Sequence, residues 1–167
     1  DMVSRGLGDV YKRQGLQIAT IEFCRNVLGM EGANSTEFED NPEHAAVVFM
    51  PEISKTHLGG TMRLGSRPTL WQHEGSTIRE LYGPGDAVDE RHRHRYEVNP
   101  DLIHSIESEG LVFVGKDESG QRCEIFELND HPYYVGVQFH PEFKSRPGRP
   151  SPPFLGLLKA ASGQLNR

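Results

Sequence analysis

Residues 134 to 143 read YVGVQFHPEF, a mostly apolar run that stops at a polar pair. The apolar part, YVGVQF (134–139), is short and rich in β-branched and aromatic residues, which predicts a buried strand. His140 and Glu142 follow two apart, and alternate side chains of an extended chain point the same way. Pro141 between them stiffens the step. The stretch therefore predicts a strand whose end carries a histidine and a carboxylate side by side.

Several other short runs are apolar or alternating and are bounded by turn residues, which predicts further strands. They are AAVVF (45–49), MRLG (62–65), LVFVG (111–115) and CEIFEL (123–128). The strands between 111 and 139 follow one another closely, which favours an antiparallel portion. Strands mixed with helices indicate an α/β domain.

Helices are predicted in four places. Apolar residues recur densely from Gly15 to a stop near Gly29, which predicts a helix buried on most of its faces. Further helices are expected at 76–83, at 99–110, where Asn99 or Asp101 can cap, and at 154–162 after two prolines. A chain of 167 residues favours a single domain with one core.

The composition is that of a soluble enzyme, with 35% hydrophobic and 25% charged residues and a formal net charge of −6. The negative charge argues against nonspecific nucleic-acid binding, which depends on Lys and Arg. No apolar run approaches the roughly 18 to 20 residues of a membrane helix, and we expect no secretory leader. We therefore expect no membrane partner and a cytoplasmic location. Cys24 and Cys123 lie in apolar segments, which predicts buried, reduced side chains.

The first fourteen residues, DMVSRGLGDVYKRQ, differ from the rest of the chain. They mix glycine and charge without a clear period, and they meet GLQIATIEF with no loop chemistry between. We interpret residues 1–14 as an unrelated or artefactual tail and residues 15–167 as a partial domain. A flexible native terminus is the alternative.

His140 and Glu142 together suit the activation of a nucleophile. A carboxylate beside a histidine takes the Nδ1 proton, which fixes the tautomer and leaves Nε2 free to accept a proton from a thiol or hydroxyl. Taken alone, the same pair could be a surface ion pair or a loop histidine.

Five motifs in one order resemble the glutaminase domains of CTP synthases, which are class I glutamine amidotransferases. They are GLQ (15–17), GANSTEF (32–38), LGGTMRLG (58–65), ERHRHRYEVNP (90–100) and QFHPEF (138–143). The HPE piece is shared by many class I amidotransferases, whereas GGTMRLG and ERHRHRYEVN resemble CTP synthases in particular. The resemblance implies a flavodoxin-like α/β fold, here incomplete at the N-terminal side.

In this family the helix opens with Cys-Leu-Gly-Met/Leu-Gln, and the cysteine attacks the side-chain amide of glutamine and releases ammonia. Gly15, Leu16 and Gln17 match the last three positions. Arg13 and Gln14 stand where Cys and Leu belong. The nucleophile is therefore missing from the sequence.

No neighbouring residue replaces that cysteine. The guanidinium of Arg13 stays protonated and offers no lone pair. Cys24 lies about three helical turns further on, roughly 15 Å away or more at 1.5 Å per residue. Two explanations stay open: the true upstream sequence has been replaced up to Gln14, or the chain is a noncatalytic relative. We favour the first, because all similarity stops at one residue.

The resemblance also assigns the other site residues. His140 corresponds to the general base and Glu142 to its orienting carboxylate, while Gln17, Glu37 and Arg95 correspond to the residues that hold glutamine. The chemistry agrees, because a zwitterion needs a carboxylate for its ammonium and a planar cation for its carboxylate. The alternatives are a turn-capping Glu37 and a structural ion pair for Arg95.

Two segments invite other hypotheses. RHRHR (91–95) could bind metal or nucleic acid, but in a strand its histidines share one face and its arginines the other, with no third ligand nearby. We expect no metal site. The glycine-rich THLGGTMRLG (56–65) lacks the lysine of a phosphate-binding loop. It suits a mobile lid that responds to GTP in the family, with Arg63 as a lid residue.

The sequence thus predicts a carboxy-terminal fragment of CTP synthase, an enzyme of pyrimidine biosynthesis. The parent activity is ATP-dependent amination of UTP to CTP with ammonia from L-glutamine. ATP and Mg²⁺ would bind the missing synthase domain, GTP would activate, and the full-length protein would form a homotetramer. We expect the fragment itself to need no cofactor, to be inactive and to be poorly stable. The alternatives are a γ-glutamyl hydrolase, which would lack GGTMRLG and RHRHRYEVN, and a noncatalytic glutamine-binding or assembly subunit.

Overall fold

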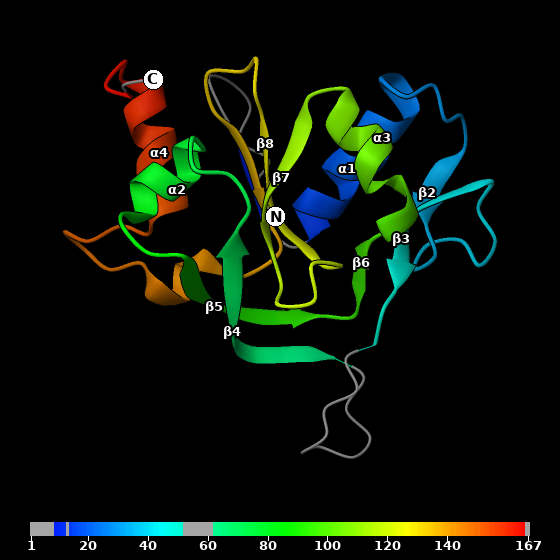
Figure 1. The fold of residues 1–167 in the computed structure, drawn as a ribbon, viewed down its shortest axis with the longest axis horizontal. Coiled ribbons are helices and arrows are strands. Elements are labelled where there is room, and N and C mark those ends of the chain that lie inside the picture. Colours follow the sequence, from blue (N-terminus) through cyan, green and yellow to red (C-terminus); the bar gives the residue numbers. More distant parts are fainter. Residues whose placement is uncertain (1–8, 13, 52–61, 166–167) are drawn as a thin grey trace.

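The computed structural model describes residues 9–12, 14–51 and 62–165. Within them the chain forms two sheets flanked by helices (Figure 1). The larger sheet has the order β1 (Asp9–Lys12), β9 (Tyr134–Val137), β8 (Cys123–Leu128), β7 (Leu111–Lys116), β4 (Arg63–Trp71) and β5 (Ala87–His94). The smaller sheet has the order β2 (Ala33–Ser35), β3 (His44–Phe49) and β6 (Tyr96–Val98). The predicted α/β class with an antiparallel portion is confirmed.

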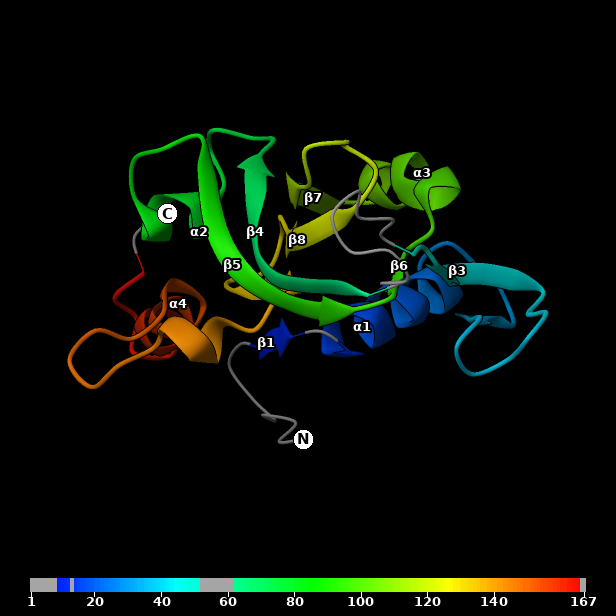
Figure 2. The ribbon, with the colours of Figure 1, turned by 90° about the horizontal axis from the view of Figure 1, so that it is seen from below.

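Parallel pairing occurs only between β1 and β9 and between β2 and β3 among the described strands. The other ladders are antiparallel, and β4 and β5 form the longest of them, from the pair Arg63–His94 to the pair Leu70–Ala87. Figure 2 shows that these two strands curl together around one side of the molecule. The strand predicted at 62–65 is therefore only the start of β4, which continues through Gly65 and Pro68 because β5 pairs with it along its length.

Helix α1 (Gln14–Asn26) packs against strands of both sheets, namely β1 and β9 of the larger and β2, β3 and β6 of the smaller. Leu16, Phe23 and Cys24 are buried in the core cluster there. The expectation of burial on most faces is only partly right, because Ile18 is 50% exposed and Val27 is 48% exposed.

The remaining helices cover the sheets at two places. Helix α2 (Thr77–Tyr82) is capped by the Ser76 side chain and packs on α4 (Pro152–Ala161) at one end of the larger sheet (Figure 1). The helix predicted at 99–110 is a 3₁₀ turn, Pro100–Leu102, followed by α3 (Ile103–Ser108), and the Asn99 side chain caps it as predicted. A second 3₁₀ turn, Pro141–Lys144, follows β9.

Strand β1 lies within residues 1–14, the segment that the sequence led us to interpret as a tail. Its backbone pairs in parallel with β9, and Gln14, the last residue of that segment, is the first residue of α1. That residues 1–14 are an unrelated or artefactual tail stays a prediction. Among the described residues, no helix has both the length and the apolar character needed to cross a membrane.

Candidate active site

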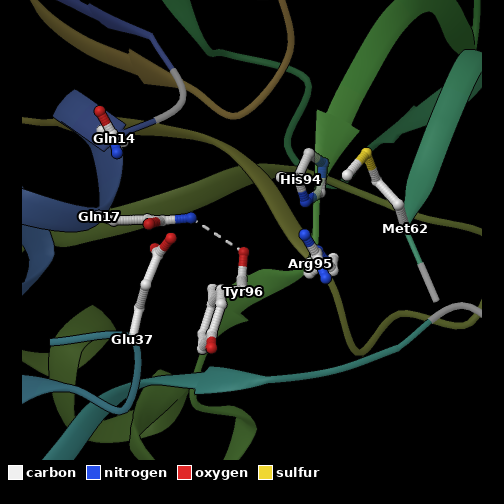
Figure 3. A pocket seen from close by; sticks show the side chains of 7 residues that line it. All are labelled: Gln14, Gln17, Glu37, Met62, His94, Arg95 and Tyr96. Carbon is white, nitrogen blue, oxygen red and sulfur yellow. Dashed lines mark hydrogen bonds between the residues drawn. The ribbon is translucent and has the colours of Figure 1, made fainter. Parts of the chain in front are cut away.

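A cavity of about 200 Å³ opens beside the first turn of α1. Its lining comes from four places in the fold, as Figure 3 shows: Gln14 and Gln17 from α1, Glu37 from the turn after β2, Met62 from the approach to β4, and His94, Arg95 and Tyr96 from the end of β5 and the start of β6. The three residues predicted to hold glutamine, Gln17, Glu37 and Arg95, are therefore brought together in one pocket.

Gln17 is buried at 3% exposure, and its side-chain amide donates to the carbonyl of Tyr96 at 2.9 Å. Its Oε1 is also buried and has no hydrogen-bond partner among the described residues. The amide is thus fixed by the protein through its nitrogen, while its oxygen is left as an acceptor for a bound molecule.

Gln138 donates to the same backbone carbonyl as Gln17. Its Nε2 donates to the Tyr96 carbonyl at 3.0 Å, and its backbone N–H donates to the carbonyl of Glu124 at 2.8 Å. Gln138 lies two residues before His140. The end of β9, the start of α1 and the β5–β6 corner therefore meet at one backbone oxygen.

Glu37 and Arg95 face the cavity from separate segments (Figure 3). The backbone N–H of Glu37 donates to Ser35 Oγ at 3.1 Å, which fixes the turn and leaves the carboxylate for the pocket. Both side chains are solvent-exposed, and neither forms an ion pair within the described part of the chain. The pocket therefore presents one anionic and one cationic group that are not neutralised by each other.

His140 and Glu142 form a pair just beyond β9. His140 Nδ1 lies 2.8 Å from Glu142 Oε1, and the backbone N–H of His140 donates to the Arg91 carbonyl at 2.9 Å. The other ring nitrogen, Nε2, is buried without a hydrogen-bond partner in the residues that the structure describes. This arrangement fixes a tautomer that leaves Nε2 as a proton acceptor. Neither residue belongs to the lining of the pocket; Gln138 connects them to it.

Arg63 lies at the start of β4 rather than in a loop. Its side chain is buried, with Nη2 2.8 Å from Glu124 Oε1. Most of the predicted lid falls on residues 52–61, outside the described residues, and the lid role of Arg63 stays a prediction. The neighbouring Met62 lines the pocket instead.

The described part of the structure offers no substitute for the missing cysteine nucleophile. Arg13 lies outside the described residues. Cys24 is fully buried in α1, and burial raises its pKa to about 11. Such a thiol stays protonated and inaccessible at neutral pH, so Cys24 cannot act as the nucleophile. Both cysteines are free and buried, as predicted.

Comparison with known proteins shows the family of the chain. The model of the family "Glutamine amidotransferase class-I" matches residues 14–160. The chain belongs to this family. Among class I amidotransferases, it is 60% identical over 157 residues to CTP synthase 2 of Saccharomyces cerevisiae, covering 90% of this chain and 27% of that protein. It is 57% identical over 152 residues to CTP synthase 1 of Homo sapiens, covering 91% of this chain and 26% of that protein.

Two solved structures also resemble the chain. The Trypanosoma brucei CTPS glutaminase domain with bound acivicin superposes with a TM-score of 0.85 at 34% identity, covering 95% of this chain and 61% of that one. A putative GMP synthase protein from Thermoplasma acidophilum shares the fold, with a TM-score of 0.55 at 17% identity over 92% of this chain and 57% of that one. The chain spans about a quarter of the length of the CTP synthases that it matches.

The candidate site holds groups that the sequence does not reveal. The Tyr96 carbonyl is a backbone atom and leaves no signal in the sequence. Gln138 lies within QFHPEF and has no role predicted from the sequence. The pattern RHRHR suggests His94 only as a metal ligand, yet His94 lines the pocket; no group of three His, Cys, Asp or Glu within the described ranges could hold a metal ion.

Proposed function

We propose that this chain is the glutaminase part of a CTP synthase and that its pocket binds L-glutamine. The observation that carries the proposal is the lining of the cavity, which brings Gln17, Glu37 and Arg95 together. The Glu37 carboxylate and the unpartnered Oε1 of Gln17 suit an ammonium, and the Arg95 guanidinium suits a carboxylate. A volume of about 200 Å³ can accommodate an amino acid.

The His140–Glu142 pair supports a role in amide hydrolysis. With its Nδ1 proton held by Glu142, His140 would take a proton from an attacking thiol through Nε2 and return it to the departing ammonia. This chemistry needs a nucleophile. Because Arg13 stands where the family has cysteine, the chain as given would bind glutamine without hydrolysing it.

In the full-length protein, the ammonia would serve the ATP-dependent amination of UTP to CTP. The synthase segment would bind UTP, ATP and Mg²⁺, with GTP as activator and a cytoplasmic homotetramer as the assembly. The similarity to CTP synthases over nearly the whole chain supports this wider proposal.

Calorimetric titration of the purified chain with L-glutamine tests the pocket, and an assay of ammonia release tests the chemistry. Saturable binding without ammonia release is the expected result. Absence of binding at millimolar glutamine would refute the proposed ligand, and ammonia release by the chain with Arg13 would refute the assignment of the nucleophile.

The second candidate function is a noncatalytic role in glutamine binding or in assembly, and the specific observation that favours it is Arg13 itself. It predicts the same binding of L-glutamine in the calorimetric titration, but it also predicts that the full-length transcript encodes Arg13. A full-length message that encodes Arg13 would support it, and one that encodes cysteine would exclude it.

A further inference from the structure

His94 lines the glutamine pocket, yet both of its ring nitrogens lie against other protein groups. Nε2 lies at hydrogen-bond distance, 2.9 Å, from Nδ1 of His92, and Nδ1 lies at ion-pair distance, 3.2 Å, from Glu97 Oε1, without hydrogen-bond geometry in the described structure. The side chains of all three residues are buried. His94 therefore presents a ring whose polar atoms are turned away from the ligand, although a histidine in a pocket would ordinarily be taken for an acid or base.

The position of one proton follows from the partner of Nδ1. The buried Glu97 carboxylate also lies 3.3 Å from Arg122 Nε, so it faces a cation as well as the His94 ring. An ionised carboxylate offers only lone pairs, so a hydrogen on the His94 nitrogen that faces it is the favourable arrangement. The opposite tautomer would place a lone pair 3.2 Å from Oε1 and is disfavoured.

The other ring nitrogen of His94, Nε2, is hydrogen-bonded to His92 in either protonation state of the His94 ring. Burial lowers the pKa of His92 to about 2, so His92 is neutral at neutral pH. Between its Nδ1 and His94 Nε2, one atom donates and the other accepts. Whichever donates, Nε2 of His94 is used within the histidine pair.

These contacts brace the corner from which Arg95 projects. His94 is the last residue of β5 and Glu97 lies in β6, so their contact spans Arg95 and Tyr96. Within that span the Tyr96 carbonyl receives the amides of Gln17 and Gln138. A shift of the His94 ring would therefore move both the guanidinium and the carbonyl that orients Gln17.

We propose that His94 is a positioning residue of the pocket, which closes the corner around Arg95 through Glu97 and keeps its Nδ1 proton when ligand binds. The proposal rests on the proposed function, because it takes L-glutamine as the ligand. It assigns to His94 no proton transfer with the substrate.

Nitrogen NMR of the ¹⁵N-histidine-labelled chain tests the proton directly and needs no variant except to assign the signals. The expected spectrum shows His94 protonated at Nδ1, and saturating L-glutamine leaves that pattern unchanged. An unprotonated Nδ1, or a change of tautomer on adding glutamine, would overturn the proposal.

Titration of two variants tests the positioning role. In His94→Asn the amide nitrogen can take the place of Nδ1, whereas in His94→Gln it reaches toward the place of Nε2. We expect His94→Asn to bind L-glutamine within about threefold of the unmodified chain and His94→Gln to bind about tenfold or more weakly, since displaced binding groups lose affinity steeply. His104→Asn, at an exposed histidine of α3, is the matched control.

The two experiments separate this inference from the proposed function. Thermal unfolding shows whether each His94 variant is folded. If a variant is not folded, the nitrogen NMR of the unmodified chain tests the proposal instead. Equal losses in the two folded variants would overturn the positioning role. If the unmodified chain binds no L-glutamine, the proposed function fails, and the nitrogen spectra still show whether Glu97 holds the His94 proton.

Discussion

His140 Nδ1 lies 2.8 Å from Glu142 Oε1, and the opposite ring nitrogen is left without a partner in the described structure. In a chain with the family cysteine restored (Arg13→Cys with Gln14→Leu), we expect ammonia release to appear. Glu142→Gln in that background should reduce it about 10²- to 10⁴-fold, because the histidine loses the group that fixes its tautomer. Glu118→Gln, at an exposed residue, is the control. An unchanged rate in Glu142→Gln would show that the pair does not serve catalysis.

Arg95 should contribute to affinity through its planar fork. Arg95→Lys keeps the charge but loses paired donation to a carboxylate, so we expect L-glutamine to bind about tenfold more weakly, which corresponds to about 1.4 kcal/mol. Arg93→Lys, at an exposed residue of β5 two positions earlier, should leave affinity unchanged. Calorimetric titration measures both, and an unchanged affinity in Arg95→Lys would mean that Arg95 acts only through its charge.

Glu37 should select for the ammonium of the ligand. Glu37→Gln removes the negative charge, and we expect about tenfold weaker binding of L-glutamine, since charge-assisted hydrogen bonds are roughly twice as strong as neutral ones. The nearby exposed Asp40→Asn serves as the control. Competition with an analogue that lacks the amino group sharpens the test: the native chain should discriminate against it and Glu37→Gln should not.

Glu124 should make stability depend on pH. Burial raises the pKa of this carboxyl from 4.5 to about 7, although Arg63 opposes the shift. Between these values the unfolded chain releases the proton and the folded chain retains it, so this residue's contribution to the free energy of unfolding falls as pH rises from 4.5 to 7 and is constant above. His92 acts in the opposite direction below pH 6.5, because its pKa is lowered to about 2.

A variant isolates the Glu124 contribution. Urea unfolding at several pH values gives the free energies of unfolding of the native chain and of Glu124→Gln. As pH rises from 4.5 to 7, the native chain should lose stability relative to Glu124→Gln. Glu118→Gln should show no such trend. A pH-independent difference for Glu124→Gln would mean that the carboxyl titrates normally in the folded protein.

Gly156 should be intolerant of a methyl group even though it lies in a helix. A Cβ built there would lie 2.5 Å from Leu81 Cδ1 of α2 and 2.5 Å from Tyr133 Cζ. Gly156→Ala should therefore destabilise the chain by about 1 to 3 kcal/mol through overpacking, instead of stabilising the helix. Gly75→Ala has open space and should be nearly neutral. Thermal unfolding compares the two, and a stabilised Gly156→Ala would contradict the packing of α4 on α2.

Apolar patterning predicted the elements that bury apolar residues, and it failed where the buried residues are polar. Strand β5 was not among the predicted strands, because its inward-facing residues are Glu90, His92 and His94. The period of an extended chain predicted that the arginines and the histidines of RHRHR lie on opposite faces, and the structure exposes the arginines and buries the histidines. Gln17, Glu37 and Arg95 were named from their chemistry and the family resemblance, and the structure places them in one cavity.

The Tyr96 carbonyl has both lone pairs occupied by side-chain amides, from Gln17, 79 residues earlier in the chain, and Gln138, 42 residues later. Both contacts require long loops to close before they form, and loop closure of this length is slow compared with helix or turn formation. The pocket is thus expected to be assembled late in folding, after both arms of the chain have arrived. During synthesis on the ribosome, its floor could be completed only once Gln138 had emerged.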